Sequence, residues 1–134
     1  MKTFDVQSVG IRTPASRAFD YIADAANLPN WTNAFKRVDG GKALLETPQG
    51  GVNIDLVTTA RRDTGTIDWK MTFPDGAVGV AFSRVTPDGE ENSVYAFVLM
   101  APPVPLEALE GALDAQRLTL ARELLRLKNI LEVR

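Results

Sequence analysis

The segment 11–31 constrains the fold more than any other part of the chain. A strand-like stretch ends at its start, and Thr13 and Pro14 follow. Thr13 is expected to cap a helix, and Pro14 suits the first turn, where the missing N–H of proline is least harmful. Apolar residues then recur at helical spacing, and a second short helix is predicted around residues 27–31. The chain therefore places two short helices directly after its first strand.

The middle of the chain predicts an antiparallel sheet. Clusters of Gly, Pro and Asp suited to tight turns occur at 39–41, 48–51, 63–65, 74–76 and 87–89. A first strand is expected at 3–12, and the segments between the turns have strand length, at about 34–38, 42–47, 52–62, 66–73, 77–86 and 92–101. Apolar and polar residues alternate most clearly around Ile54 and Trp69, so these strands should each bury one face. Short hairpin turns between consecutive strands imply a meander.

A long amphipathic helix is predicted at the end of the chain. Prolines at 102, 103 and 105 stop the last strand and precede it. Its leucines form a narrow stripe at helical spacing, which is typical of a helix packed on a sheet. An intermolecular coiled coil would use the same stripe, but Gly111 and the preceding strands favour an intramolecular role. The stripe consists of Leu106, Leu109, Leu113, Leu120, Leu124, Leu127 and Leu131.

The two ends of the chain together point to a known architecture. The motif residues of the first segment are, in order, Thr13, Pro14, Phe19, Ile22, Asp24, Leu28, Pro29 and Trp31. Their order resembles the front end of the START-like or SRPBCC superfamily (polyketide cyclase/dehydrase, Bet v 1-like). The resemblance implies an α+β helix-grip fold, with an antiparallel sheet of about seven strands wrapped around the C-terminal helix. It covers nearly the whole chain, so residues 1–134 are expected to form one domain.

Composition excludes several function classes. The net charge is −2 and the pI is about 5.1, so there is no excess positive charge to neutralise nucleic acid. With no cysteine and no histidine, thiolate chemistry, imidazole catalysis and sulfur-ligated metals are excluded. No metal site and no cofactor are expected. No apolar run is long enough to span a membrane, and Asp5 interrupts the start where a signal peptide needs apolar residues, so a cytoplasmic location is expected.

The resemblance implies a protein that binds a small apolar or aromatic molecule between sheet and helix. Two alternatives stay open: an enzyme of the aromatase/cyclase, dehydratase or isomerase type, and a co-chaperone-like interaction module. The last alternative predicts an exposed apolar patch. A homodimer is also allowed. The candidate ligand-binding residues are Trp31, Arg84, Tyr95, Leu113, Gln116, Arg117 and Leu120.

The polar ligand-binding candidates are chosen by their position in the alternation of a strand or the repeat of a helix. Gln116 and Arg117 interrupt the leucine stripe and are hypothesised to face the ligand; the alternative is that they lie at its edges and reach solvent. Arg84 follows the apolar set of its strand and would attract an anionic group if that face is enclosed. Tyr95 would donate its phenol to a ligand, or pack with its hydroxyl at the edge. Trp31 would wall the ligand, or anchor the core.

Three aspartates have simpler interpretations. Asp24 lies between the two short helices and is expected to act as a helix cap. Asp55 and Asp68 are expected on the solvated face of their strands, because the apolar residues claim the buried face. A pair of catalytic carboxylates is the alternative for these two.

Overall fold

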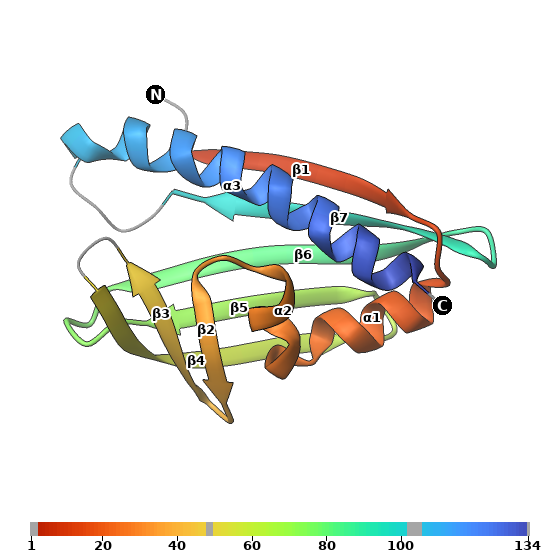
Figure 1. The fold of residues 1–134 in the computed structure, drawn as a ribbon, viewed down its shortest axis with the longest axis horizontal. Coiled ribbons are helices and arrows are strands. Elements are labelled where there is room, and N and C mark those ends of the chain that lie inside the picture. Colours follow the sequence, from red (N-terminus) through yellow and green to blue (C-terminus); the bar gives the residue numbers. More distant parts are fainter. Residues whose placement is uncertain (1–2, 48–49, 102–105, 134) are drawn as a thin grey trace.

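The computed structural model describes residues 3–47, 50–101 and 106–133 of the 134-residue chain. The predicted α+β class is confirmed, with seven strands and a long last helix (Figure 1). The predicted turn residues Pro48 and Gln49 and the prolines at 102–105 lie outside the described residues. The elements are β1 (Phe4–Ile11), α1 (Ala15–Ala23), the 3-10 helix η1 (Ala25–Asn27), α2 (Leu28–Trp31), β2 (Phe35–Asp39), β3 (Lys42–Thr47), β4 (Gly50–Arg61), β5 (Thr66–Thr72), β6 (Val78–Asp88), β7 (Asn92–Met100) and α3 (Leu106–Glu132).

The strands form one antiparallel sheet in the order β1-β7-β6-β5-β4-β3-β2. From β2 to β7 each strand pairs with the next, as expected for a meander with short turns. β1 pairs with β7, so β1 and β2 are the two edges of the sheet. α1, η1 and α2 carry the chain from one edge to the other, which explains why two short helices must follow the first strand (Figure 1).

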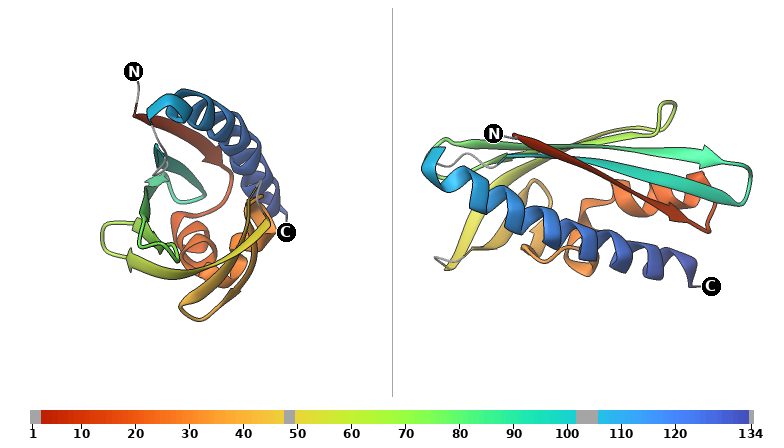
Figure 2. Two further views of the ribbon diagram at one scale, coloured as in Figure 1. Left: turned by 90° about the vertical axis from the view of Figure 1, so that its left-hand side faces the viewer. Right: turned by 90° about the horizontal axis from the view of Figure 1, so that it is seen from above.

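α3 bridges the two edges of this curved sheet (Figure 2). On one side it lies against β1, where the side-chain amide of Gln7 donates to the carbonyl of Arg117 at 2.8 Å. On the other side, a carboxylate oxygen of Glu123 accepts from the backbone N–H of Asn33, between α2 and β2, at 2.7 Å. The helix therefore closes the gap between β1 and β2, and the predicted helix-grip arrangement is confirmed.

The start of α1 differs in detail from the prediction. Thr13 is not the helix cap: Pro14 occupies that position, and no side chain caps α1 there. Thr13 is instead buried, with its carbonyl accepting from the Ser93 hydroxyl at 3.0 Å and its hydroxyl accepting from Arg17 at 3.1 Å. Thr13 thus contacts Ser93 of β7 and does not cap α1. Asp24 does cap η1, since its carboxylate accepts from the N–H of Ala26 at 3.1 Å.

The core lies between the inner face of the sheet and the helices. The alternation predicted around Ile54 and Trp69 is confirmed, because both are buried while their neighbours Asp55 and Asp68 belong to the opposite, outer set. Five leucines of the predicted stripe are at most 4% exposed: Leu113, Leu120, Leu124, Leu127 and Leu131. The side chains of Leu106 and Leu109 lie outside what the structure describes.

Burial on the inner face changes along the strands. Near α1 and the last turns of α3, Ile67 and Tyr95 are completely buried, and we call this the closed end. Toward the opposite end, the inner residues Val52, Met71 and Leu99 are only half-buried although they pack against the core, and we call this the open end. Inner side chains are therefore fully covered at one end and partly uncovered at the other.

Candidate functional site

Four buried aromatic rings lie in contact between these two ends. We call Trp31, Trp69, Tyr95 and Phe97 the aromatic cluster. Trp31 and Tyr95 meet edge to face, with ring centroids 6.3 Å apart. Tyr95 and Phe97 do the same at 6.3 Å, and Phe97 stacks on Trp69 at 6.2 Å. Such offset and edge contacts stabilise aromatic pairs beyond the area they bury.

Three members of the aromatic cluster carry polar atoms without partners. Trp31 Nε1, Trp69 Nε1 and Tyr95 Oη are buried and make no hydrogen bond within the part of the chain that the structure describes. Buried polar groups in native proteins are normally hydrogen-bonded, because leaving one unpaired costs about 1–3 kcal/mol. Three such atoms in one set of touching rings therefore distinguish this region from the rest of the described core.

The Tyr95 hydroxyl stays protonated. Burial raises the pKa of this phenol far above its usual value, because the phenolate would lose its hydration. The hydroxyl of Ser83, on the neighbouring strand, lowers this pKa, but by less. Ser83 donates its own proton to the carbonyl of Ile67 at 2.6 Å. Tyr95 is thus a neutral hydrogen-bond donor.

Four predicted ligand-binding residues belong to the interior. Trp31 and Tyr95 are 2% and 0% exposed and touch each other in the aromatic cluster. Leu113 and Leu120 are buried on α3. The alternative in which the Tyr95 hydroxyl lies at an edge is wrong, because Oη itself is buried. Whether any of the four contacts a ligand stays a prediction.

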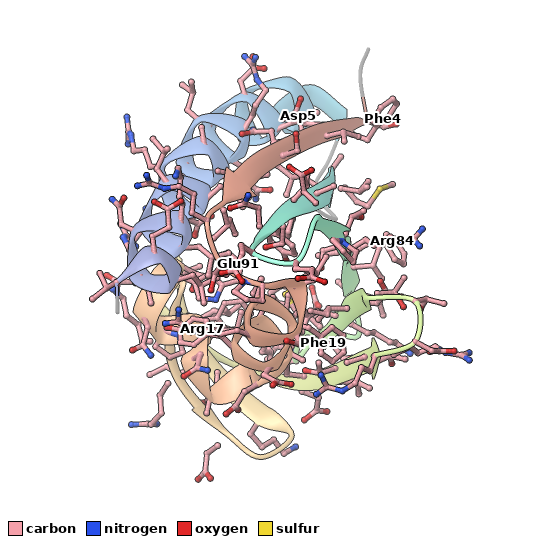
Figure 3. The ribbon with its side chains drawn as sticks, turned by 90° about the vertical axis from the view of Figure 1, so that its right-hand side faces the viewer. Phe4, Asp5, Arg17, Phe19, Arg84 and Glu91 are labelled. Atoms are coloured by element: carbon pink, nitrogen blue, oxygen red, sulfur yellow. The ribbon has the colours of Figure 1, made fainter. Side chains whose placement is uncertain are left out.

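The expectation that Arg84 faces the enclosed side of the sheet is wrong. Arg84 does share a face with Val78 and Phe82, as its phase predicted, but these side chains are exposed and the alternate set, Ala81 and Val85, is buried. Figure 3 shows the guanidinium directed away from the interior. The larger apolar residues Val78 and Phe82 of β6 therefore lie on its outer face with Arg84.

Gln116 and Arg117 both have exposed side chains on α3. Arg117 lies 3.6 Å from the carboxylate of Asp114 one turn earlier. This arrangement matches the alternative in which the interruption of the stripe lies at its edge and reaches solvent. Their predicted ligand contacts have no support from burial.

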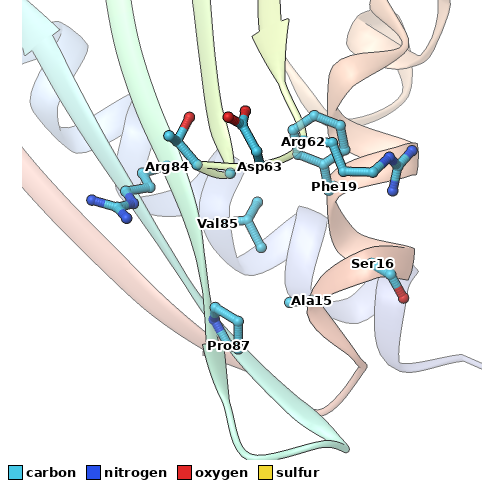
Figure 4. A pocket seen from close by; sticks show the side chains of 10 residues that line it. Ala15, Ser16, Phe19, Arg62, Asp63, Arg84, Val85 and Pro87 are labelled. Atoms are coloured by element: carbon cyan, nitrogen blue, oxygen red, sulfur yellow. The ribbon is translucent and has the colours of Figure 1, made fainter.

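A surface pocket of about 280 Å³ lies between α1, the β4–β5 turn and β6 (Figure 4). Gly65 in that turn approaches β6 so closely that a Cβ atom would stand 2.2 Å from the carbonyl oxygen of Val85. Arg62 covers the ring of Phe19 at 4.9 Å and pairs with Asp20. The charge of Arg62 is thus already paired with that of Asp20, whereas Arg84, which also lines the pocket, makes no ion pair in the described chain. The lining residues are Ala15, Ser16, Phe19, Arg62, Asp63, Thr64, Gly65, Arg84, Val85 and Pro87.

Two carboxylates hold α3 in place, and their pKa values are shifted in opposite directions. Burial raises the pKa of Glu123, and the Asn33 N–H and Arg126 offset this effect only in part. Hydrogen bonds from Lys128 and from Arg12 lower the pKa of Glu132 to about 2. Neither carboxylate contacts the aromatic cluster in any hydrogen bond of the described chain. Both therefore serve the attachment of α3.

Asp55 and Asp68 are not a catalytic pair. Asp55 is opposite Thr72 in the sheet and pairs with Lys42, whereas Asp68 is opposite Thr59. Both lie on the outer face. Among the described residues, no group of three or more acidic side chains is arranged to hold a metal ion, and no helix is long and apolar enough to cross a membrane.

The outer face carries an apolar row across three strands. Val6 is opposite Val98, which is opposite Phe82. Val6 and Phe82 are 56% and 43% exposed, and Phe4 and Val78 on the same face are 46% and 44% exposed. An exposed apolar patch is the feature that the interaction-module alternative predicts.

Sequence reasoning assigned Trp69 and Phe97 no role in the site. Alternation placed Trp69 correctly on the buried face, but only as a core residue. A signal was present: an indole on a buried strand face must find an acceptor for its N–H or leave it unpaired. Phe97 has no polar atom, and only its stacking between Trp69 and Tyr95 makes it part of the cluster.

The fold and the aromatic cluster together define the class as helix-grip proteins with an aromatic interior. The chain belongs to the family described as polyketide cyclase / dehydrase and lipid transport, whose model matches residues 5–132. Membership in the superfamily suggested by the sequence is therefore confirmed. No curated protein matches the chain.

Solved structures share this fold at low sequence identity. The protein XoxI from Bacillus cereus is 14% identical with a TM-score of 0.71, over 97% of this chain and 96% of that one. The Zhui aromatase/cyclase from Streptomyces sp. R1128 is 10% identical with a TM-score of 0.67, over 96% and 93%. A START superfamily protein from Mycobacterium smegmatis is 13% identical with a TM-score of 0.63, over 96% and 99%. These similarities establish the fold alone.

Proposed function

We propose that the protein binds a small apolar or aromatic molecule between the inner face of the sheet and α3, entering at the open end and reaching the aromatic cluster. The observation that carries this proposal is the change in burial along the inner face. Met71 and Leu99 are half-buried apolar side chains directly beside fully buried aromatic rings. Covering such apolar surface with a ligand is favourable by about 25 cal/mol per Å².

The chemistry of the interior fits an apolar guest. Its buried side chains are mostly aliphatic and aromatic, with a few polar atoms at particular positions, which is the usual composition of a small-molecule site. Family membership supports the same function, because the family description includes lipid transport.

A neutral fluorescent probe, N-phenyl-1-naphthylamine, tests the proposal. We expect one saturable site per chain and a midpoint of thermal unfolding that rises with probe concentration, because a ligand of the folded state stabilises it. Absence of saturable binding across a varied set of apolar compounds would contradict the proposal. Similarity to an aromatase/cyclase keeps catalysis as the alternative, so bound compounds are recovered and analysed: unchanged compound supports binding, and a product supports an enzyme.

Self-association is a second candidate, favoured by the apolar row of Val6, Val98 and Phe82. Its position on one open sheet face suits a two-fold dimer in which the same surface meets itself. Sedimentation of the purified protein over a wide concentration range tests this, with Phe82→Lys as the variant that should remain monomeric. A wild-type protein that is monomeric throughout the range excludes it.

A further inference from the structure

The three unpartnered polar atoms of the aromatic cluster are all able to donate. An indole N–H is a donor only, and a tyrosine hydroxyl donates as well as accepts. Trp31, Trp69 and Tyr95 are each at least 96% buried, and water does not reach their polar atoms from the surface. The cluster thus presents donors without acceptors.

Neighbouring groups leave the donors of Trp69 and Tyr95 free. The rings of Trp69 and Phe97 stack with an angle of 28° between their planes, so the indole N–H, which lies in the ring plane, does not point at the face of Phe97. The Ser83 hydroxyl lies near enough to Tyr95 to affect its pKa, but it donates to the carbonyl of Ile67 and forms no hydrogen bond with Tyr95 Oη. Within the described chain, no carbonyl or carboxylate accepts from Trp69 Nε1 or Tyr95 Oη.

The register of the sheet orders these donors along the path of entry. Trp69 is opposite Ala81, which is opposite the half-buried Leu99, so Trp69 belongs to the row nearer the open end. Tyr95 is opposite Val85, two rows deeper. A molecule entering at the open end would meet the Trp69 indole first and the Tyr95 phenol afterwards, with Trp31 behind it.

The charge of the buried residues limits the charge that a ligand can carry. The described buried residues include no lysine or arginine, and their one ionisable acid is Asp5. An anionic ligand would lose its hydration without gaining a counter-charge, which is strongly unfavourable. A neutral molecule avoids this cost.

We propose, building on the proposed function, that the ligand is a neutral aromatic or alicyclic molecule with carbonyl or ether oxygens, which accept hydrogen bonds from Trp69 Nε1 and Tyr95 Oη. Trp31 Nε1 is the third donor, for a ligand long enough to reach it. Aromatic faces of Phe97 and Trp69 hold the ring system, and the donors fix its orientation. A hydrocarbon of the same shape would leave the donors unpaired.

Matched pairs of compounds test the proposal. Indane and fluorene are compared with 1-indanone and 9-fluorenone, which have the same skeletons and one added carbonyl, by calorimetric titration of the intact protein. We expect the ketone of at least one pair to bind about two- to tenfold more tightly than its hydrocarbon, the range that one net hydrogen bond supplies. Both tryptophans of the chain belong to the cluster, so their emission reports whether a compound reaches it.

Variants of the protein then show which donor causes the preference for the ketone over the hydrocarbon. Tyr95→Phe removes only the hydroxyl and should reduce the preference for the ketone while leaving the affinity for the hydrocarbon unchanged. Trp69→Phe gives a second measurement if Tyr95→Phe fails to fold. Phe97→Leu is the matched control, because it removes a ring without a donor and should change the affinity for ketone and hydrocarbon equally.

The outcomes separate this inference from the function on which it rests. If ketone and hydrocarbon bind with equal affinity, or if Tyr95→Phe and Trp69→Phe leave the preference intact, the donor role is overturned while ligand binding stands. If neither compound of either pair binds and the wider apolar set also fails, the proposed function itself is overturned.

Discussion

The closed and open ends of the inner face are built from the same kinds of residue but differ in what covers them. At the closed end, α1, α2 and the C-terminal half of α3 bury Ile67, Tyr95 and Leu127 completely. At the open end, Met71 and Leu99 have the same inward orientation and stay half-buried. Coverage by helices therefore separates a region that holds the fold together from a region that is available to a ligand.

Hydrogen bonds reinforce the same division. Arg126 reaches the carbonyl of Trp31 at 3.4 Å, and Arg17 reaches the carbonyl of Val133 at 3.0 Å, so the end of α3 is tied to both short helices. The aromatic cluster lies where this attached region meets the open end. Its unpaired donors are thus held by a rigid framework, which limits the ordering cost of binding.

The largest expected effect is at the closed end. Leu127→Ala should lower the free energy of unfolding by about 2–5 kcal/mol, because it leaves a cavity among fully buried side chains. Leu125, on the same helix and 57% exposed, is the matched control, and Leu125→Ala should cost less than about 0.5 kcal/mol. Urea denaturation measures both, and equal losses would show that the closed end is not the stabilising region.

Filling the open end should block the ligand and spare the fold. Gly79 lies on the inner face of β6, and a Cβ there would make ordinary contacts with Met71 at 3.5 Å and Phe73 at 3.6 Å. Gly79→Leu should weaken binding of N-phenyl-1-naphthylamine at least tenfold, or about 1.4 kcal/mol. Gly10→Leu is the control, since its Cβ meets nothing within 4 Å. Unchanged affinity in Gly79→Leu would place the ligand elsewhere.

Acid should loosen the end of α3 through Glu132. Its pKa is lowered to about 2 in the folded protein, so its carboxylate contributes stability that is present above the ordinary value of 4.5 and lost as pH falls toward 2. The difference in unfolding free energy between wild type and Glu132→Gln should be constant near neutrality and should shrink between pH 4.5 and 2. A difference that does not depend on pH would contradict this role.

Glu123 provides a control, because its pKa is shifted in the opposite direction to that of Glu132. Its folded-state pKa is raised, so its contribution is fully present below the unfolded value and is lost as pH rises through the folded value. Wild type should therefore gain stability relative to Glu123→Gln as the solution is acidified. The same denaturation series measures both variants, and a parallel response would show that burial is not what distinguishes the two carboxylates.

The smallest effect is expected on the outer face. Arg84→Gln should change the free energy of unfolding by less than about 0.5 kcal/mol, because the side chain is exposed and makes no ion pair in the described chain. Probe affinity should stay unchanged. A large loss of affinity would mean that the ligand occupies the surface pocket which Arg84 helps to line, rather than the interior.

Much of the fold could be predicted because its signals are local. Turn residues at 39–41 and 63–65 mark the ends of strands, and the prolines and leucine spacing mark α3. Each of these signals depends on backbone geometry within a few residues. Strand boundaries accordingly agree with the prediction to within two residues.

The site could be predicted only in part, because its polar features depend on contacts between residues that are distant in sequence. Trp31 and Tyr95 are 64 positions apart in sequence, and their contact exists only because α2 packs across from β7. The stripe interruption at Gln116 suggested a polar interior group, yet the side chain is exposed. The unpaired donors arise from the absence of acceptors nearby, and no single position in the sequence encodes that absence.

The sequence by itself determined that β6 has two sets of side chains, because alternation in a strand has a period of two residues. Only the tertiary structure decided which set is enclosed: the helices pack over Ala81, Ser83 and Val85, while the larger Val78 and Phe82 face outward. The physical reason is that alternation separates the side chains of a strand into two faces but does not determine which face is buried. The covered face is chosen by pairing with β5 and β7 and by the position of α3, and these depend on the whole chain.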